Sequence, residues 1–168
     1  MVGGPAHGPA GRGVRHAGDM TLDWKIVVDC ADPHAQAAFW AAALGYVVED
    51  NRVLIERLLS AGVIPQDTVV TMDDRPAFRT LQAVRHPDDP VQEGTGIGLG
   101  RRLLFQQVPE SKTVKNRWHL DLHAGPDRRD GEVARLRELG AAVLREIKEP
   151  GTEHVVMADP EGNEFCVQ

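Results

Sequence analysis

Two stretches of this chain carry the same order of structural signals, and that repeat limits the folds open to it. Residues 21–50 and residues 116–149 each predict a strand, then a helix, then a second strand. Both helices end in a Leu-Gly pair, at Gly45 and at Gly140, because glycine commonly ends a helix. A unit that occurs twice indicates an internal duplication, so the sequence predicts two similar modules sharing one core.

Each unit finishes in further strands. Residues 153–168 predict a hairpin, because Asp159-Pro160-Glu161-Gly162 places proline at the second and glycine at the fourth position of a turn. The counterpart of its last strand in the first unit is residues 101–108, with Phe105 equivalent to Phe165. Both units therefore have the order strand, helix, strand, strand, strand.

The segment between the units, residues 50–100, has no counterpart in the second unit. Residues 50–62 predict a short helix, and two strands follow it. The apolar residues expected to face inward on that helix are Val53, Leu54, Ile55 and Leu58. Residues 87–100 predict a mobile loop that lies over one end of a pocket as a lid. Its alternating glycines precede a strand rather than a helix, so they predict no nucleotide site.

The charge balance excludes some classes of partner. The sequence has 19 lysine and arginine residues against 25 aspartate and glutamate residues, a net charge of -6. Phosphate backbones require a basic field, so we expect no nucleic acid partner. No apolar run reaches the ~18 residues of a membrane-spanning helix, and the N-terminus lacks the apolar core of a signal peptide. We therefore expect no membrane partner and a cytoplasmic location.

The ends of the chain and its cysteines give simpler expectations. Residues 1–19 are rich in glycine and nearly devoid of large apolar side chains, so they predict a disordered leader, with Met20 as the working start. Residues 20–168 predict a single domain with one well-buried core. Cys30 and Cys166 form no CxxC pair and are predicted to face opposite ways, so we expect free thiols.

The segment NRWHLDLHAG, residues 116–125, carries the densest set of reactive side chains. Strand alternation places His119, Asp121 and His123 on one face and apolar residues on the other. A strand rises about 3.3 Å per residue, so the two histidines stand about 13 Å apart, too far to share one ion. The segment therefore favours a polar pocket wall over a metal centre.

The repeated order of elements is found with three motifs: ADPHAQAAFWAAALGY in the first unit, HLDL opening the second, and DPEGNEF near the end. Together they resemble the vicinal oxygen chelate superfamily of glyoxalases, bleomycin resistance proteins and dihydroxybiphenyl dioxygenases, over residues 22–168. The resemblance implies an α+β fold of two βαβββ modules, about residues 22–110 and 116–168. Curled mixed sheets would then surround a central trough, where members hold a divalent metal with four side chains.

The resemblance also implies where those four ligands would lie. They fall on Lys25, Gln106 (or Gln107 if the alignment slips), His119 and Cys166. Only His119 is the residue that metal-binding relatives use, and lysine is a cation with no free lone pair at neutral pH. We therefore expect no metal and no other cofactor, and a pocket of polar side chains instead.

Strand alternation assigns further side chains to such a trough. His119 and Asp121 are the catalytic candidates, which would move a proton next to a carbonyl group. The predicted pocket residues are Lys25, Asp29, Gln106, His123, Glu164 and Cys166. Trp24 and Trp118 are predicted to face the core. An ion pair between Asp121 and Lys25 across the trough, with no chemistry attached, is the simpler alternative for these two.

Three functions stay open at this point. The chain is a glyoxalase-like lyase or isomerase, or a non-catalytic protein that binds or sequesters a small molecule, as metal-free antibiotic-resistance relatives do, or a purely structural or interaction domain. Few aromatic side chains are expected to face the trough, which favours a polar or anionic ligand with Lys25 and Arg102 as contacts. Open sheet edges predict a homodimer. No motif names the substrate.

Overall fold

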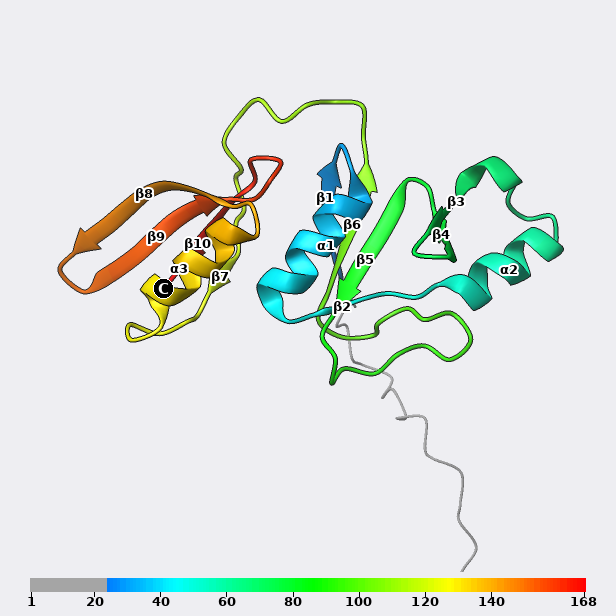
Figure 1. The fold of residues 1–168 in the computed structure, drawn as a ribbon, viewed down its shortest axis with the longest axis horizontal. Coiled ribbons are helices and arrows are strands. Elements are labelled where there is room, and N and C mark those ends of the chain that lie inside the picture. Colours follow the sequence, from blue (N-terminus) through cyan, green and yellow to red (C-terminus); the bar gives the residue numbers. More distant parts are fainter. Residues whose placement is uncertain (1–23) are drawn as a thin grey trace, which may run out of the picture.

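The computed structural model describes residues 24–168, so the leader and the start at Met20 lie outside the described residues. Two four-stranded sheets stand side by side (Figure 1). The first has the spatial order β1 (Ile26–Cys30), β6 (Arg102–Gln107), β5 (Leu81–Arg85), β2 (Val47–Val48). The second has the order β7 (Asp121–Leu122), β10 (Glu164–Val167), β9 (Thr152–Ala158), β8 (Ala142–Glu149).

The two sheets repeat one topology. In each, the first strand of the unit pairs in parallel with the last, β1 with β6 and β7 with β10. The remaining neighbours pair antiparallel. The prediction of two βαβββ modules in an α+β fold is therefore confirmed. Phe105 lies on β6 and Phe165 on β10, the last strand of each module.

The helices of the two units begin and end where the sequence indicates. The first, α1 (Pro33–Leu44), is capped by the Asp32 carboxylate, which accepts hydrogen bonds from the backbone N–H groups of His34 and Ala35 at 3.0 Å each. Gly45 ends it in the left-handed conformation, with φ of 67°. The second unit's helix is α3 (Arg129–Glu138). No helix within residues 24–168 is long and apolar enough to cross a membrane.

One hydrophobic core joins the two modules, and α1 lies at its centre. The rings of Phe105 and Phe165 are 0% and 1% exposed. The indole of Trp40 on α1 packs edge-on against Phe165 of the other module, with ring centroids 5.2 Å apart. Because side chains from both units belong to the same buried cluster, the modules cannot separate without exposing it.

The turn before β10 links the second module to the start of α1. The backbone N–H of Gly162 donates to the Asp159 carbonyl at 2.9 Å, which confirms the predicted turn. The Glu161 carboxylate then accepts the N–H groups of Ala31 and Asp32 at 2.7 and 2.9 Å. A side chain of one module thus occupies N–H groups at the helix start of the other, where negative charge is favourable.

Two further contacts hold α1 along its length. The Trp40 indole N–H donates to the buried carboxylate of Asp159 at 3.1 Å. At the other end, the Arg135 guanidinium on α3 donates to the carbonyls of Ala42 and Ala43 at 2.9 and 2.8 Å. The C-terminal carbonyls of α1 have no partner within the helix, so a cation from α3 is well placed there.

The insertion between β2 and β5 forms its own small layer beyond the first sheet (Figure 1). It contains α2 (Arg52–Ser60), a 3-10 turn η1 (Gln66–Thr68) and the antiparallel pair β3 (Val69–Met72) and β4 (Arg75–Phe78). Ile55 is fully buried as predicted, whereas Val53 is 58% exposed, because α2 has a layer of protein on one side only.

The expectation of a mobile loop before β6 is not supported by its contacts. The Gly98 N–H donates to the buried carboxylate of Glu49 at 2.7 Å, and the Asn51 side chain donates to the Thr95 carbonyl at 2.9 Å. Gly96 has φ of 75° and passes so close to the Asp50 carbonyl that a side chain would not fit. The glycines therefore serve close packing against residues 49–51.

The prediction that Trp24 and Trp118 face the core is wrong. Their exposed fractions are 82% and 89%. The strand expected over residues 116–125 forms only at Asp121–Leu122, which pair with Cys166 and Val167 of β10. Trp118 therefore precedes the strand, and strand alternation does not apply to it. Trp24 likewise precedes the first residue of β1.

Candidate functional site

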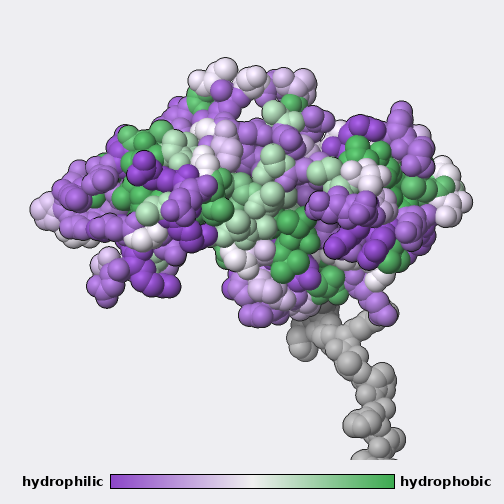
Figure 2. Space-filling model, viewed as in Figure 1, coloured by the Kyte–Doolittle hydropathy of each residue, from purple (hydrophilic) through white to green (hydrophobic). Residues whose placement is uncertain are grey.

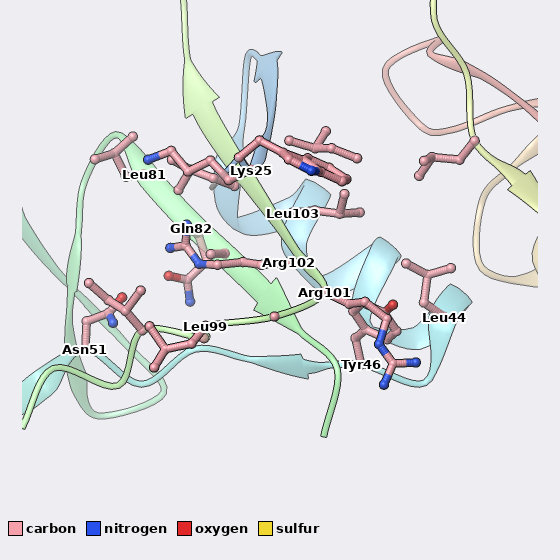
Figure 3. A pocket seen from close by; sticks show the side chains of 18 of the residues that line it. Lys25, Leu44, Tyr46, Asn51, Leu81, Gln82, Leu99, Arg101, Arg102 and Leu103 are labelled. Atoms are coloured by element: carbon pink, nitrogen blue, oxygen red, sulfur yellow. The ribbon is translucent and has the colours of Figure 1, made fainter. Parts of the chain in front are cut away.

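A cavity of about 1030 Å³ lies over the first sheet and is closed on one side by the insertion (Figure 3). Its apolar lining comes mainly from the first sheet, the insertion and the loop before β6, and includes Leu44, Leu54, Phe78, Leu81, Ala83, Ile97, Leu99, Leu103 and Leu104. Its polar lining includes Lys25, Tyr46, Asn51, Gln82, Arg101 and Arg102. Leu120, Asp121 and Leu122 reach it from the second module. A concave, mostly apolar space with a few polar groups is the usual form of a small-molecule site.

A buried ion pair holds the wall of this cavity. The Glu49 carboxylate, which is fully buried, accepts Arg102 Nε at 2.7 Å and Nη2 at 2.9 Å. The same carboxylate accepts the Gly98 N–H, so one group ties β2, β6 and the loop together. A bidentate pair with a further N–H donor compensates both charges for the loss of water.

A second ion pair lies at the loop's outer end. The Asp89 carboxylate accepts the backbone N–H of Arg101 at 2.6 Å and its side-chain Nε and Nη2 at 3.1 and 2.8 Å. Hydrogen bonds from the Arg101 side chain and then from its backbone lower the pKa of Asp89 to about 2. The loop is therefore fastened at both ends by arginine–carboxylate pairs.

The second module places His119, Asp121 and Cys166 together. His119 Nε2 lies 3.2 Å from Asp121 Oδ1, and each side chain is 44% exposed. Cys166 stands opposite Asp121 in the β7–β10 register and is 8% exposed. One nitrogen, oxygen or sulfur atom from each residue lies within 4.8 Å of the others. The Gln168 amide donates to the other oxygen of Asp121 at 3.3 Å.

Both cysteines are free, buried thiols. Burial raises the pKa of Cys166, and the Asp121 carboxylate raises it further. Burial, with Glu161 as the next cause, raises the pKa of Cys30 to about 12. Because the thiolate is the nucleophilic form, neither cysteine is suited to covalent catalysis at neutral pH.

The remaining predicted residues lie away from the cavity. The Glu164 carboxylate accepts the Asn116 N–H at 2.9 Å and lies 3.2 Å from Lys112 Nζ. Burial acts to raise the pKa of Glu164, but hydrogen bonds from backbone N–H groups and Lys112 outweigh it and lower the pKa. Asp29 and Gln106 are exposed partners across β1 and β6. His123 lines a separate hollow between the modules.

The structure thus divides the predicted site into parts. Lys25 and Asp121 line the large cavity, and Asp121 also belongs to the cluster with His119 and Cys166. The alternative of an ion pair between Asp121 and Lys25 is wrong, because the Asp121 carboxylate lies beside the imidazole of His119 and not beside the Lys25 ammonium group. Tyr46 and the insertion residues Asn51 and Phe78 were not predicted to line the cavity. The glycines of residues 94–100 could have indicated a packed wall at this position, but they were interpreted as a mobile loop.

The glyoxalase-like domain family matches residues 25–168. The chain belongs to this family. No curated protein sequence is significantly similar to it.

Solved structures share the fold at low sequence identity. A glyoxalase/bleomycin resistance protein/dioxygenase family enzyme from Burkholderia phytofirmans is 13% identical, with a TM-score of 0.52 over 85% of this chain and 94% of that one. The fosfomycin resistance protein FosX from Mesorhizobium loti is 12% identical, with a TM-score of 0.52 over 89% and 90%. A FosX variant from Listeria monocytogenes, solved with Mn(II) and a dihydroxypropylphosphonic acid, is 10% identical, with a TM-score of 0.51 over 86% of both chains. At these identities the likeness concerns the fold alone.

The family's usual divalent metal centre does not fit this chain. Lys25, which precedes β1, and Gln106 on β6 offer a cation and a weak amide oxygen where imidazole and carboxylate ligands are needed. The donors that the described residues bring together are the imidazole, carboxylate and thiol of His119, Asp121 and Cys166. This set suits a softer ion such as Zn²⁺, but its thiol must first lose a proton that burial retains.

Proposed function

We propose that this protein binds a small organic molecule in the large cavity and moves a proton next to its carbonyl group, as a glyoxalase-like lyase or isomerase. The observation that carries the proposal is the position of Asp121, which lines the cavity and lies 3.2 Å from His119 Nε2. Asp121 thus lies at the edge of the cavity, next to the imidazole that would carry out the acid–base chemistry.

The chemistry follows from the two nitrogens of His119. A carboxylate beside Nε2 favours the proton on that nitrogen, which leaves Nδ1 with a free lone pair. Nδ1 takes the proton from the carbon next to the carbonyl, and the C–H electron pair forms a C=C bond while the carbonyl π pair moves to oxygen. Where the reacting carbon carries a hydroxyl group, that group passes its proton to the enolate oxygen and becomes the new carbonyl, while His119 returns its proton to the former carbonyl carbon, which isomerises the ligand. Departure of a leaving group with its electron pair from the carbon beyond the reacting carbon instead makes the step an elimination.

We further propose that this step does not use the family's usual metal centre. Two of the four ligand positions carry Lys25 and Gln106, which are poor ligands for a divalent ion. At a third, the buried thiol of Cys166 has a raised pKa and is protonated at neutral pH. Of the residues predicted for the pocket, Lys25 then contacts the ligand, and the others support the fold around the cavity: Asp29, Gln106, His123, Glu164 and Cys166.

A non-catalytic binding or sequestering function is the second candidate. The observation that favours it is that His119 itself does not line the cavity, whose walls are largely apolar. A ligand could then be held without reaching the imidazole. Binding without any turnover would be the signature of this alternative.

We also propose a homodimer. Trp24 and Trp118 are 82% and 89% exposed, and Val27 on β1 is 43% exposed. Figure 2 shows hydrophobic surface near the middle of this face and further patches toward both ends. Exposed tryptophans are typical of surfaces that become buried on association. Light scattering should give twice the chain mass at micromolar concentration, and a monomer under those conditions would contradict the proposal.

The exchange of carbon-bound protons with solvent tests the function without knowledge of the product. A panel of hydroxy-carbonyl, keto-acid and thioester compounds is incubated with the protein in D₂O, and loss of the proton next to the carbonyl is followed by NMR. Wild-type protein and the control His154→Ala should catalyse exchange of at least one compound, because His154 lies on β9 away from the cluster. His119→Ala should slow it about 100-fold or more. Equal exchange by His119→Ala would refute the assignment, and binding without exchange would favour the second candidate.

A further inference from the structure

Two cations stand next to each other on the floor of the large cavity. In the parallel pairing of β1 with β6, Ile26 is opposite Leu103, so the preceding residues, Lys25 and Arg102, are also neighbours. Both line the cavity. Figure 3 shows their side chains extending over the same part of the sheet. Like charges on adjacent strand positions destabilise a sheet unless a counter-charge lies close by.

The carboxylates near the cavity do not supply that counter-charge to Lys25. Glu49 is bound to Arg102, and Asp89 is bound to Arg101. Asp121, the carboxylate that lines the cavity, lies against His119. No carboxylate within residues 24–168 forms an ion pair with Lys25. The positive charge of this cavity wall is therefore not fully compensated by the described residues.

Arg102 also keeps hydrogen-bonding capacity. Glu49 occupies its Nε and Nη2 atoms, while Nη1 donates no hydrogen bond to another residue within 24–168. Because the ion pair holds the guanidinium in place, Nη1 is a preorganised donor rather than a flexible one. A rigid donor beside an ammonium group matches the two oxygens of a carboxylate.

Apolar side chains complete the recognition surface. Leu54 and Phe78 come from the insertion, while Leu81 and Leu104 come from the sheet. These groups cannot contribute to holding an inorganic anion, but they favour an apolar body attached to one. A volume of about 1030 Å³ accommodates a molecule of drug size.

We propose that the cavity binds an organic anion, with its carboxylate on Lys25 and Arg102 Nη1 and its apolar body between the insertion and the first sheet. This inference rests on the proposed function, because it names the ligand class of the same cavity. The fixed cation of Lys25 lies at one of the positions where the family resemblance implies a metal ligand. The ammonium group of Lys25 thus provides, in place of a metal ion, the positive charge that attracts the ligand's oxygen atoms.

Matched pairs of ligands test the proposal. Each member of a series of aromatic and alkyl carboxylates is compared with its own carboxamide, and dissociation constants are measured by titration calorimetry on the full chain. At least one carboxylate should bind about tenfold more tightly than its amide, since a charge-assisted contact is stronger than a neutral one. Lys25→Met should remove that preference. Lys148→Met, which removes the same charge from an exposed position on β8, should retain it.

A cavity-filling variant separates the two possible failures. Leu81→Trp should weaken binding of carboxylate and amide alike, because it fills the shared apolar space. If carboxylates and amides bind equally to wild-type protein and to Lys25→Met, but not to Leu81→Trp, the anion inference is wrong and the cavity function stands. If Leu81→Trp does not weaken binding, or if neither kind of compound binds, both the inference and the proposed cavity function are contradicted.

Discussion

The two modules repeat one topology, yet different structures lie over their sheets. In the first module the insertion between β2 and β5 and the loop between β5 and β6 both contribute residues to the large cavity. In the second module no insertion interrupts the unit, and His119 and Asp121 remain 44% exposed. From this comparison we propose that the two modules have different roles. The first module binds the ligand, and the second supplies the groups that transfer the proton. Asp121 lies where the two meet.

The division depends on a fixed arrangement of the modules, which α1 provides. Its start is held by Glu161 of the second module, its middle by Asp159 and Phe165, and its end by Arg135. A ligand in the cavity of one module can meet a side chain of the other only while this arrangement is kept. Variants that weaken one module at a time can therefore test whether the two modules depend on each other and what each contributes.

The largest effect is expected at the equivalent phenylalanines of the two modules. Phe105→Ala and Phe165→Ala should each lower the free energy of unfolding by about 4 kcal/mol, because both rings are completely buried in the shared core. Calorimetry should show one cooperative transition in both variants, shifted to lower temperature. Two separate transitions, with only one of them shifted, would show that the modules unfold independently and would contradict the shared core.

The next effect concerns the cavity wall of the first module alone. Glu49→Gln leaves the Arg102 cation, which is 11% exposed, without its charge partner, so we expect a loss of about 3 kcal/mol in denaturant unfolding. Glu146→Gln removes one member of an exposed pair with Lys148 and should change stability by less than about 0.5 kcal/mol. A Glu49→Gln variant as stable as this control would mean that the buried pair does not support the wall.

A smaller effect, which disappears in acid, concerns the loop. The pKa of Asp89 is lowered to about 2 in the folded protein, so its pairing with Arg101 stabilises the fold above the ordinary carboxyl pKa and is lost as the pH falls toward 2. Wild-type protein should therefore melt at a higher temperature than Asp89→Asn at pH 6, and the difference should shrink as the pH falls from about 4 to 2. Asp88→Asn, at a neighbouring carboxylate that is 85% exposed, should show no such trend.

The sequence predicted the duplicated parts of this fold well, because the repeat supplied two independent signals for each element. The caps of α1 and the Asp159 turn follow from local patterns that occur in both units or in short turns. The cavity could not be predicted in this way, because the insertion occurs in one module only and gives no second signal. Its ion pair joins Glu49 to Arg102, 53 positions apart, and no local pattern reports such a contact.

The candidate site was predicted in part for a related reason. Alternation along one strand predicted His119 and Asp121 on one face, and the family resemblance led to Cys166 on the facing strand; the structure brings these three side chains together. Alternation failed for Trp118, since it continues only as far as a partner strand does. Glu164 could not be distinguished from a pocket residue, because its partners Lys112 and Asn116 lie in an irregular segment.

The metal content of untagged protein, purified without chelators, tests the central claim most directly. The claim is that ligand binding at Lys25 and proton transfer at His119 and Asp121 replace the metal chemistry of the family. Elemental mass spectrometry should find far less than one Zn, Mn, Fe or Ni per chain, both as purified and after incubation with each ion followed by desalting. About one ion per chain that disappears in His119→Ala and in Cys166→Ser would contradict the account and assign these residues as metal ligands.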